Sequence, residues 1–225
     1  FSPHGGSLGH LLEFIDGLSL AYEKHDLILY TKSENLELLG PNLLSKCTVK
    51  LSRASSYGNL FRVLWGQLIL PFLVQKDSID VLFCPGNISP IIKTCNTKSQ
   101  WIATIGPFVK DTYTAINMYT KLYNLVNKYL ILLSGLTSNV VIHESKFSQQ
   151  LFEREYNFKS ERQFLIECGK DNFFSPNCEN IQSRNVISNI TSDDLLCVSH
   201  LYPYKNMEVL IEAVAEYKLK YTSEL

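Results

Sequence analysis

The alternation of short apolar runs with longer amphipathic segments restricts the fold of this 225-residue sequence more than any other feature. Short apolar runs bounded by turn residues are typical of buried strands, whereas apolar residues three and four positions apart indicate helices. The predicted strands are residues 26–31, 48–52, 79–84, 101–105, 139–143, 164–167 and 195–199. Predicted helices begin near residues 8, 33, 58, 112, 145 and 207, with Ser145 as an N-cap and a kink at Pro71.

This order predicts an α/β protein, with a Rossmann-like parallel sheet that has helices on both faces. The first β-α unit of a second Rossmann-like domain is expected to follow. We expect the first domain to span residues 1–175, a polar linker to span 176–193, and the second domain to start at 194 and stop at 225. Because the chain begins with Phe1 and stops just beyond a helix, we expect it to be a fragment.

Composition excludes several classes of protein. A net charge of -1 and the absence of a basic run argue against nucleic acid as a partner. The six cysteines show no Cys-x-x-Cys pair and no His at zinc-ligand spacing, so we expect reduced thiols, no metal site and a cytoplasmic protein. No apolar run reaches the length of about 18 residues that spans a bilayer. The longest, Leu60–Val74, leaves peripheral membrane association open.

The first candidate binding segment is the glycine-rich run His4–Gly9, directly before the first predicted helix. Glycines let a backbone approach a bulky anion, and a helix N-terminus offers unpaired N–H groups. Gly5, Gly6 and Ser7 are therefore candidate contacts for a sugar diphosphate. A plain tight turn before a helix explains the same residues equally well.

The second candidate segment is Ser199–Asn206, between the last predicted strand and the last helix. Lys205 lies where a cation would meet a diphosphate and stabilise the charge that develops as a nucleotide leaves. Asn206 follows it and is a candidate for the same cleft. The alternative interpretation is a solvated lysine at the start of a helix.

The run Cys197–Asn206, followed by Leu210–Ala213, resembles the opening of the donor domain in family 4 retaining glycosyltransferases, which have the GT-B fold. That family has Gly-Arg-Leu, a short spacer, and then Lys-Asn or Lys-Gly before an amphipathic helix. Three further segments are similar to family landmarks in the same order: Gly5-Gly6, Val141–Phe147 and Cys168–Phe174. The resemblance spans nearly the whole chain and implies a GT-B amino-terminal domain plus the start of the donor domain.

The resemblance implies an activity and the roles of several residues. It implies transfer of a sugar from a nucleoside diphosphate sugar to a glycan, lipid-linked or small-molecule acceptor, without a cofactor. Lys205 would bind the donor diphosphate, and His200 stands where the family has Arg. A neutral imidazole donates one hydrogen bond rather than a bidentate charge, so this contact would be weaker. Pro107 and Phe108 resemble a loop that faces the cleft, although a strand-ending turn with a core Phe explains them equally well.

Other features set limits on this function. The family's paired-Glu motif would lie beyond Leu225, so we expect the fragment alone to be inactive. No side chain is identified as a catalytic base, and we expect four residues near strand or loop ends to be structural: His4, His10, His143 and Glu144. Two alternatives stay open. One is a GT-B-like sugar-nucleotide epimerase or phosphorylase, and the other is a non-catalytic nucleotide-sugar-binding relic.

Overall fold

The computed structural model of the chain describes residues 7–21, 25–52, 58–108, 118–167, 169, 195–199 and 205–221. These residues form two units. The first contains the described residues up to 167, and the second contains residues 169, 195–199 and 205–221. The boundaries expected at residues 175 and 194 lie outside the described residues.

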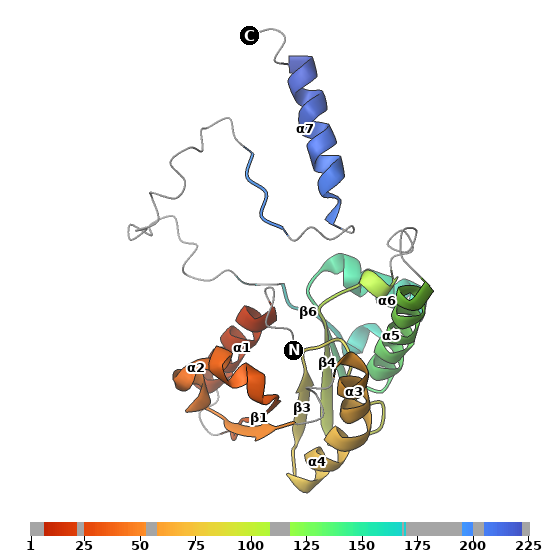
Figure 1. Cartoon of the computed structure of the whole chain (residues 1–225). Helices are drawn as coiled ribbons and strands as arrows, with labels where there is room; N and C mark the ends of the chain where they lie inside the picture. The colour runs from red at the N-terminus through yellow and green to blue at the C-terminus, as the bar shows by residue number, and fades with distance from the viewer. Residues whose placement is uncertain are drawn as a thin grey trace. The chain divides into compact units, whose positions relative to one another are not determined.

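The first unit alternates helices with short parallel strands (Figure 1). Its helices are α1 (Ser7–Ala21), α2 (Leu36–Leu44), α3 (Asn59–Leu64), α4 (Leu70–Lys76), α5 (Met118–Leu136) and α6 (Lys146–Tyr156). Its strands are β1 (Ile28–Thr31), β2 (Thr48–Leu51), β3 (Val81–Cys84), β4 (Thr97–Ile102), β5 (Val140–His143) and β6 (Gln163–Leu165). Strands β1 and β2 form one parallel pair, and the other four form a parallel sheet in the order β3-β4-β5-β6. The expected α/β class with parallel, Rossmann-like pairing is therefore confirmed.

One face of the four-stranded sheet carries the main core. The register places Leu82 beside Lys98, Gln100 beside Val141, and His143 beside Leu165, so these side chains point to the same side. Helices α4, α5 and α6 cover this face. The buried cluster there contains Ile102, Phe108, Ile131, Val141, Phe152 and Phe158, and a second cluster joins Val74 of α4 to Leu82 and Cys84.

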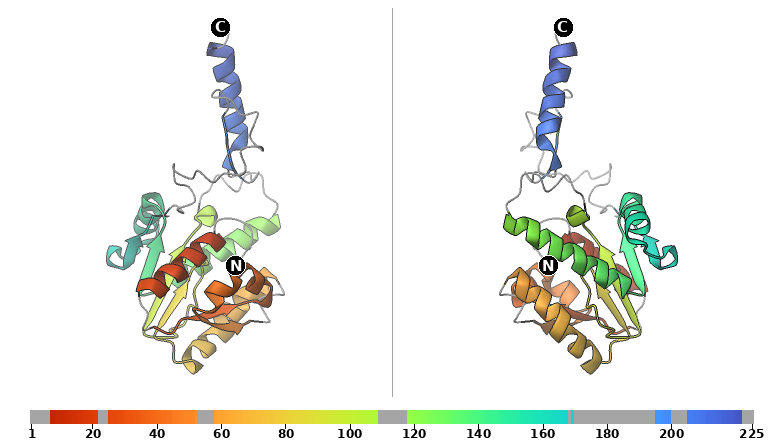
Figure 2. Two further views of the ribbon diagram at one scale, coloured as in Figure 1. Left: turned by 90° about the vertical axis from the view of Figure 1, so that its left-hand side faces the viewer. Right: turned by 90° about the vertical axis from the view of Figure 1, so that its right-hand side faces the viewer.

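The opposite face of the same sheet is covered by α1 (Figure 2). The Phe14 ring stacks on Phe83 of β3 with ring centroids 4.2 Å apart. The His10 ring meets Trp101 of β4 edge-on at 6.0 Å. Helices therefore lie on both faces of the sheet, as the sequence predicted, and half-buried His10 lies between α1 and β4.

Asp77, in the turn after α4, connects the β1–β2 pair to the rest of the first unit. Its carboxylate accepts a hydrogen bond from the Tyr30 hydroxyl and lies 2.5 Å from Lys50 Nζ. Hydrogen bonds from Lys50 and Tyr30 lower the pKa of Asp77. Burial of the Tyr30 ring and the adjacent carboxylate raise the pKa of Tyr30. One residue from each strand of the pair thus contacts a single acidic side chain.

Two expectations about individual elements need correction. The helix predicted from residue 58 to 75 is divided by a π-helical turn, η3 (Trp65–Ile69). Pro71 has no N–H to donate to the carbonyl four residues earlier, and its ring crowds that carbonyl, so a wider turn before it relieves the conflict. The strand predicted at residues 101–105 is β4, which instead runs from Thr97 to Ile102. Its polar first half does not show the apolar pattern of a buried strand.

The second unit contains α7 (Met207–Tyr221), which confirms the helix expected from residue 207. The strand expected at residues 195–199 is not formed, and all five residues are exposed. Only the helical half of the expected β-α unit is therefore present.

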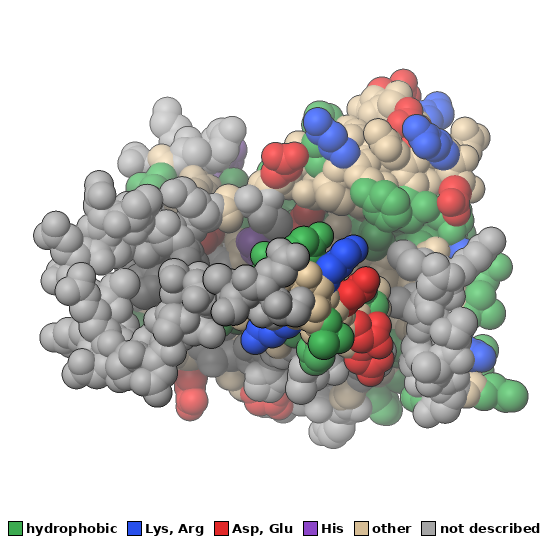
Figure 3. All heavy atoms as spheres, turned by 90° about the horizontal axis from the view of Figure 1, so that it is seen from above, with side chains coloured by type: hydrophobic (Ala, Val, Ile, Leu, Met, Phe, Trp, Pro, Cys, Tyr) green, Lys and Arg blue, Asp and Glu red, His purple; other side chains and the backbone are tan. Residues whose placement is uncertain are grey.

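The described surface carries both signs of charge. On the face seen in Figure 3, Lys and Arg side chains occur beside Asp and Glu side chains, with apolar side chains between them. This mixture agrees with the net charge of -1. Among the described residues, no helix is long and apolar enough to cross a membrane.

The tight packing between α5 and the segment after α6 gives a first test. A Cβ on Gly135 would lie 2.6 Å from Cζ of Phe158, closer still to Cε2 of that ring, and 3.0 Å from Gln100 Oε1. We expect Gly135→Ala to lower the free energy of unfolding by about 1–3 kcal/mol, because a buried ring must shift. Gly17→Ala in α1, with nothing within 4 Å of the new Cβ, is the control and should stabilise by about 0.5–1 kcal/mol. Urea unfolding measures both, and a stabilised Gly135→Ala variant would contradict this packing.

Candidate functional site

The loops after β3 and β4 are joined by Asn87 at the carboxyl edge of the sheet. Asn87 Oδ1 accepts hydrogen bonds from the N–H groups of Ala103 at 2.7 Å and Thr104 at 3.1 Å. The Asn87 N–H donates to the carbonyl of Trp101. Its φ of 65° is left-handed, a conformation that Asn adopts more readily than most residues. These hydrogen bonds connect the two loops at the edge where parallel sheets bind their ligands.

Pro107 and Phe108 lie in the turn η4 (Gly106–Phe108), which follows β4 at the same edge. Phe108 is only 5% exposed, and its ring centroid lies 4.7 Å from that of Phe152 and 5.3 Å from that of Tyr156. Lys128 Nζ lies 5.1 Å from the centroid of the Tyr156 ring, which places a cation over the same aromatic cluster. The Phe108 side chain therefore contributes to the core, and half-buried Pro107 is left as the candidate cleft residue of the pair.

His143 ends β5 and is fully buried. Its Nδ1 lies 2.9 Å from the Ser148 hydroxyl of α6, and its ring lies 5.3 Å from that of Phe152. Burial lowers the pKa of His143 to about 4, against a smaller upward effect of the nearby Gln163 side chain. The ring is therefore neutral at physiological pH. This is a histidine of the core, as the sequence suggested, and it is not placed to exchange protons with a substrate.

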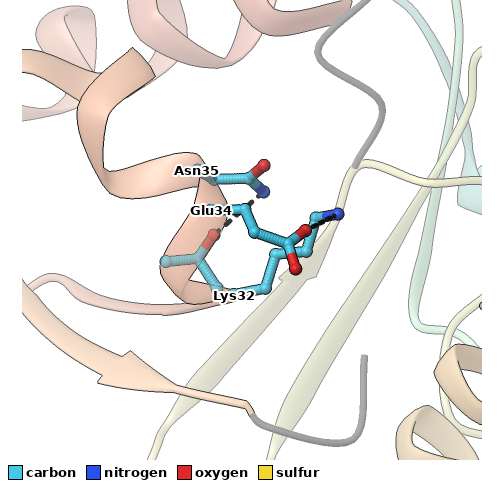
Figure 4. Close-up of polar contacts among 4 residues, drawn as sticks. Lys32, Glu34 and Asn35 are labelled. Atoms are coloured by element: carbon cyan, nitrogen blue, oxygen red, sulfur yellow. Dashed lines mark hydrogen bonds and ion pairs between the residues drawn. The ribbon is translucent and has the colours of Figure 1, made fainter. Parts of the chain in front are cut away.

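The carboxyl end of β1 holds polar residues that the sequence analysis did not single out (Figure 4). The Asn35 side chain is buried and donates to Thr31 Oγ1 at 3.3 Å. Lys32 Nζ donates to Glu34 Oε2 at 2.6 Å. Thr31-Lys32 directly follows an apolar run, and that position at a strand end could have indicated them. They add a cation and a carboxylate to the strand-end residues of the first unit.

The glycine-rich candidate lies almost entirely outside the described residues. Gly5, Gly6 and His4 belong to that part of the chain, and α1 begins at Ser7, where the sequence placed the helix. The proposed geometry, an anion at the start of α1, therefore stays a prediction. Glu144, directly after β5, is half-buried.

The lysine candidate lies in the second unit. Lys205 is exposed and directly precedes Asn206, whose φ of 51° is left-handed. The carbonyl of Asn206 accepts a hydrogen bond from the Leu210 N–H at 3.4 Å, which opens the first turn of α7. Lys205 and Asn206 thus stand at a helix start, as expected. His200 lies outside the described residues, so a shared site of His200 and Lys205 stays a prediction.

Neither the described residues nor the comparisons point to a metal site or a family. Within the described ranges, no group of three or more His, Cys, Asp or Glu residues is arranged to hold a metal ion. The cysteines described, Cys47, Cys84, Cys95 and Cys197, are free thiols. No protein-family model matches the sequence, and a search of curated proteins finds no match.

The buried His143 gives a pH-dependent prediction. Its pKa of about 4 in the folded chain is below the unfolded value near 6.5, so the unfolded chain binds the proton more tightly. Neutral His143 contributes fully to the stability of the folded chain above pH 6.5. As the pH falls from 6.5 towards 4, the free energy of unfolding decreases by roughly 3 kcal/mol in total, because the unfolded chain takes up the proton first. We expect His143→Gln to lose this part of the pH dependence of the free energy of unfolding. The exposed His25→Gln is the control, and equal slopes for the parent and His143→Gln between pH 7 and 4 would refute the assignment.

Proposed function

We propose that this chain is the acceptor-side domain, with the first part of the donor domain, of a retaining glycosyltransferase that uses a nucleoside diphosphate sugar. The observation that carries the proposal is Lys205-Asn206 at the start of the 15-residue helix α7, after a segment that resembles the donor motif of family 4 glycosyltransferases. The parallel α/β architecture of the first unit supports it, because such sheets bind ligands at their carboxyl edge.

Donor binding follows from the physical chemistry of this helix start. The first N–H groups of a helix have no partners within it, and the helix dipole is positive at that end. A lysine directly before the helix adds a full positive charge. A diphosphate between the two would bind in the ground state and gain stabilisation as negative charge grows on the leaving nucleotide. The acceptor, a glycan, a lipid-linked sugar or a small molecule, would then lie against the strand ends of the first unit.

The two alternative functions make different demands on the chain. An epimerase needs acid and base groups in the first unit, and His143, a neutral core residue bound to Ser148, does not suit that task. A nucleotide-sugar-binding relic is favoured by the His at position 200, where the related enzymes have Arg. The relic and the transferase differ in how strongly the Lys205 segment binds a diphosphate.

Calorimetric titration with UDP, GDP and ADP tests the donor site. We expect Lys205→Ala to weaken binding of the preferred nucleotide by about 10- to 100-fold, the value of a charge-assisted hydrogen bond. Lys218→Ala, a matched lysine further along α7, should bind like the parent. His200→Arg should bind about tenfold more tightly, because Arg forms bidentate contacts with phosphate. Equal affinities of the parent and Lys205→Ala would show that the diphosphate binds elsewhere.

We further propose that the first unit associates peripherally with a membrane, which would suit a lipid-linked acceptor. Helices α3, α4 and α5 lie on the same side of the four-stranded sheet in the right-hand view of Figure 2. These helices carry many exposed apolar side chains. Those on α3, η3 and α4 include Leu60, Phe61, Leu64, Leu68, Ile69 and Phe72. Those on α5 include Met118, Tyr119, Leu122, Leu125, Val126 and Tyr129. Residues 59–76 and 118–136 contain four Lys or Arg residues in total and no Asp or Glu. Apolar helix faces whose only charges are positive favour an anionic lipid surface.

Vesicle co-sedimentation tests this association. We expect binding to vesicles of phosphatidylcholine with phosphatidylglycerol, and weaker binding without the anionic lipid. Leu68→Ser combined with Phe72→Ser should lower partitioning at least about tenfold, because two large apolar side chains no longer enter the bilayer. Leu20→Ser on α1, also strongly exposed, is the control. Indifference to the double substitution would place any membrane contact on another surface.

A further inference from the structure

A pocket of about 250 Å³ opens at the amino-terminal edge of the four-stranded sheet, opposite the edge that carries the candidate acceptor site. It is lined by Ile91, Lys93, Thr94, Cys95, Lys98, Thr137 and Asn139. Its walls are the connection between β3 and β4 on one side and the turn between α5 and β5 on the other. The volume suits a small polar molecule or ion rather than a nucleotide sugar.

The base of this pocket is a buried lysine. Lys98 is only 2% exposed. Its backbone N–H donates to Asn139 Oδ1, and its carbonyl accepts a hydrogen bond from the Asn139 N–H. Its Nζ donates to the carbonyl of Pro90 and to Thr137 Oγ1, the latter at 2.9 Å. An ammonium group has three donors, so one N–H of Lys98 has no partner among the described residues.

No described group neutralises this cation. Among the residues of the first unit that the structure describes, no carboxylate lies within 4 Å of Lys98 Nζ. Burial raises the pKa of the neighbouring Cys84 to about 12, so at neutral pH this side chain is an uncharged thiol. Cys95 Sγ lies 3.1 Å from the carbonyl oxygen of Thr97, to which it donates a hydrogen bond. Burying an ammonium without a counter-charge is costly, and burial lowers the pKa of Lys98 accordingly.

We propose that the pocket binds a small oxyanion, a phosphate or a carboxylate, against the unpartnered N–H of Lys98. The anion supplies the counter-charge that the described residues lack. Other donors surround the same space: the Thr94 hydroxyl, the exposed Lys93 ammonium at the rim, and Asn139 Nδ2, which stays available because Oδ1 accepts from the Lys98 N–H. A bound anion would accept hydrogen bonds from both the loop between β3 and β4 and the turn between α5 and β5.

This site is separate from the donor and acceptor sites proposed above. Those lie at the start of α7 and at the carboxyl ends of the strands, whereas Lys98 is near the amino-terminal end of β4. An anion here would act on the stability and mobility of the first unit rather than in sugar transfer. Its test is therefore independent of nucleotide binding, and Lys205→Ala should leave the anion effect unchanged.

Thermal unfolding of the full chain in sodium phosphate and in sodium acetate, each matched in ionic strength with sodium chloride, tests the proposal. At about ten times its Kd, an anion that binds only the folded state should raise the Tm by roughly 3–6 °C. We expect this rise in the parent and in Lys121→Met, an exposed lysine of α5. It should be absent in Lys98→Met, which keeps the length of the side chain and removes the charge. The comparison of phosphate with acetate shows which oxyanion the pocket prefers.

A second measurement does not depend on the folding of a variant. Titration of the ¹⁵N-labelled parent with phosphate and acetate should shift the amide signals of Thr94, Lys98 and Asn139 with one common Kd. Anion effects that are equal in the parent and Lys98→Met, amide shifts that leave Thr94, Lys98 and Asn139 unchanged, or no response to either anion would each overturn the proposal.

Discussion

The hydrogen bonds that two buried side chains of β4 donate to backbone carbonyls fix the four-stranded sheet to the loop and the helix beside it. Lys98 Nζ donates to the carbonyl of Pro90, and Gln100 Nε2 donates to the carbonyls of Asn87 and Ile131. Unpaired polar groups in such a position would cost about 1–3 kcal/mol each, more for a charge. Because their acceptors lie in the β3–β4 connection and in α5, these bonds fix the loop and the helix to the central strand.

The loop between β3 and β4 consequently contacts both edges of the sheet and two helical segments. Its first residues include Asn87, which orders the carboxyl edge, and its later residues line the pocket of Lys98 at the opposite edge. Between them, the carbonyl of Ser89 accepts hydrogen bonds from Gln67 Nε2 at 3.0 Å and Ser134 Oγ at 2.7 Å. One carbonyl thus anchors both η3 and α5. Hydrogen bonds thus fix the inner sides of η3 and α5. Their outer sides carry part of the exposed apolar and basic side chains for which membrane association is proposed above.

Local pattern was sufficient for much of the fold. The apolar runs located β1, β3 and β5 to within two residues, and periodicity located α1 and α7. Ser145 does cap α6, since its hydroxyl accepts from the Ser148 N–H at 3.2 Å. Such elements are predictable because one face is buried along their whole length and the caps involve neighbours in the chain. Of the candidate site, the position of Lys205 before a helix and the burial of His143 were predictable in the same way.

Other features depended on contacts between distant segments. The prediction placed β4 several residues too late in the chain, because Lys98 and Gln100 resemble surface residues until their partners near residues 87–90 and 131–137 are known. Phe108 resembled a cleft residue as readily as a core residue, and its contacts with Phe152 and Tyr156 placed it in the core. The sequence by itself thus determined the α/β class, the element order and the helix start at Lys205, because these follow from local periodicity. Only the tertiary structure decided which polar side chains are buried, and so revealed the pocket of Lys98, because burial is set by residues far away in the chain.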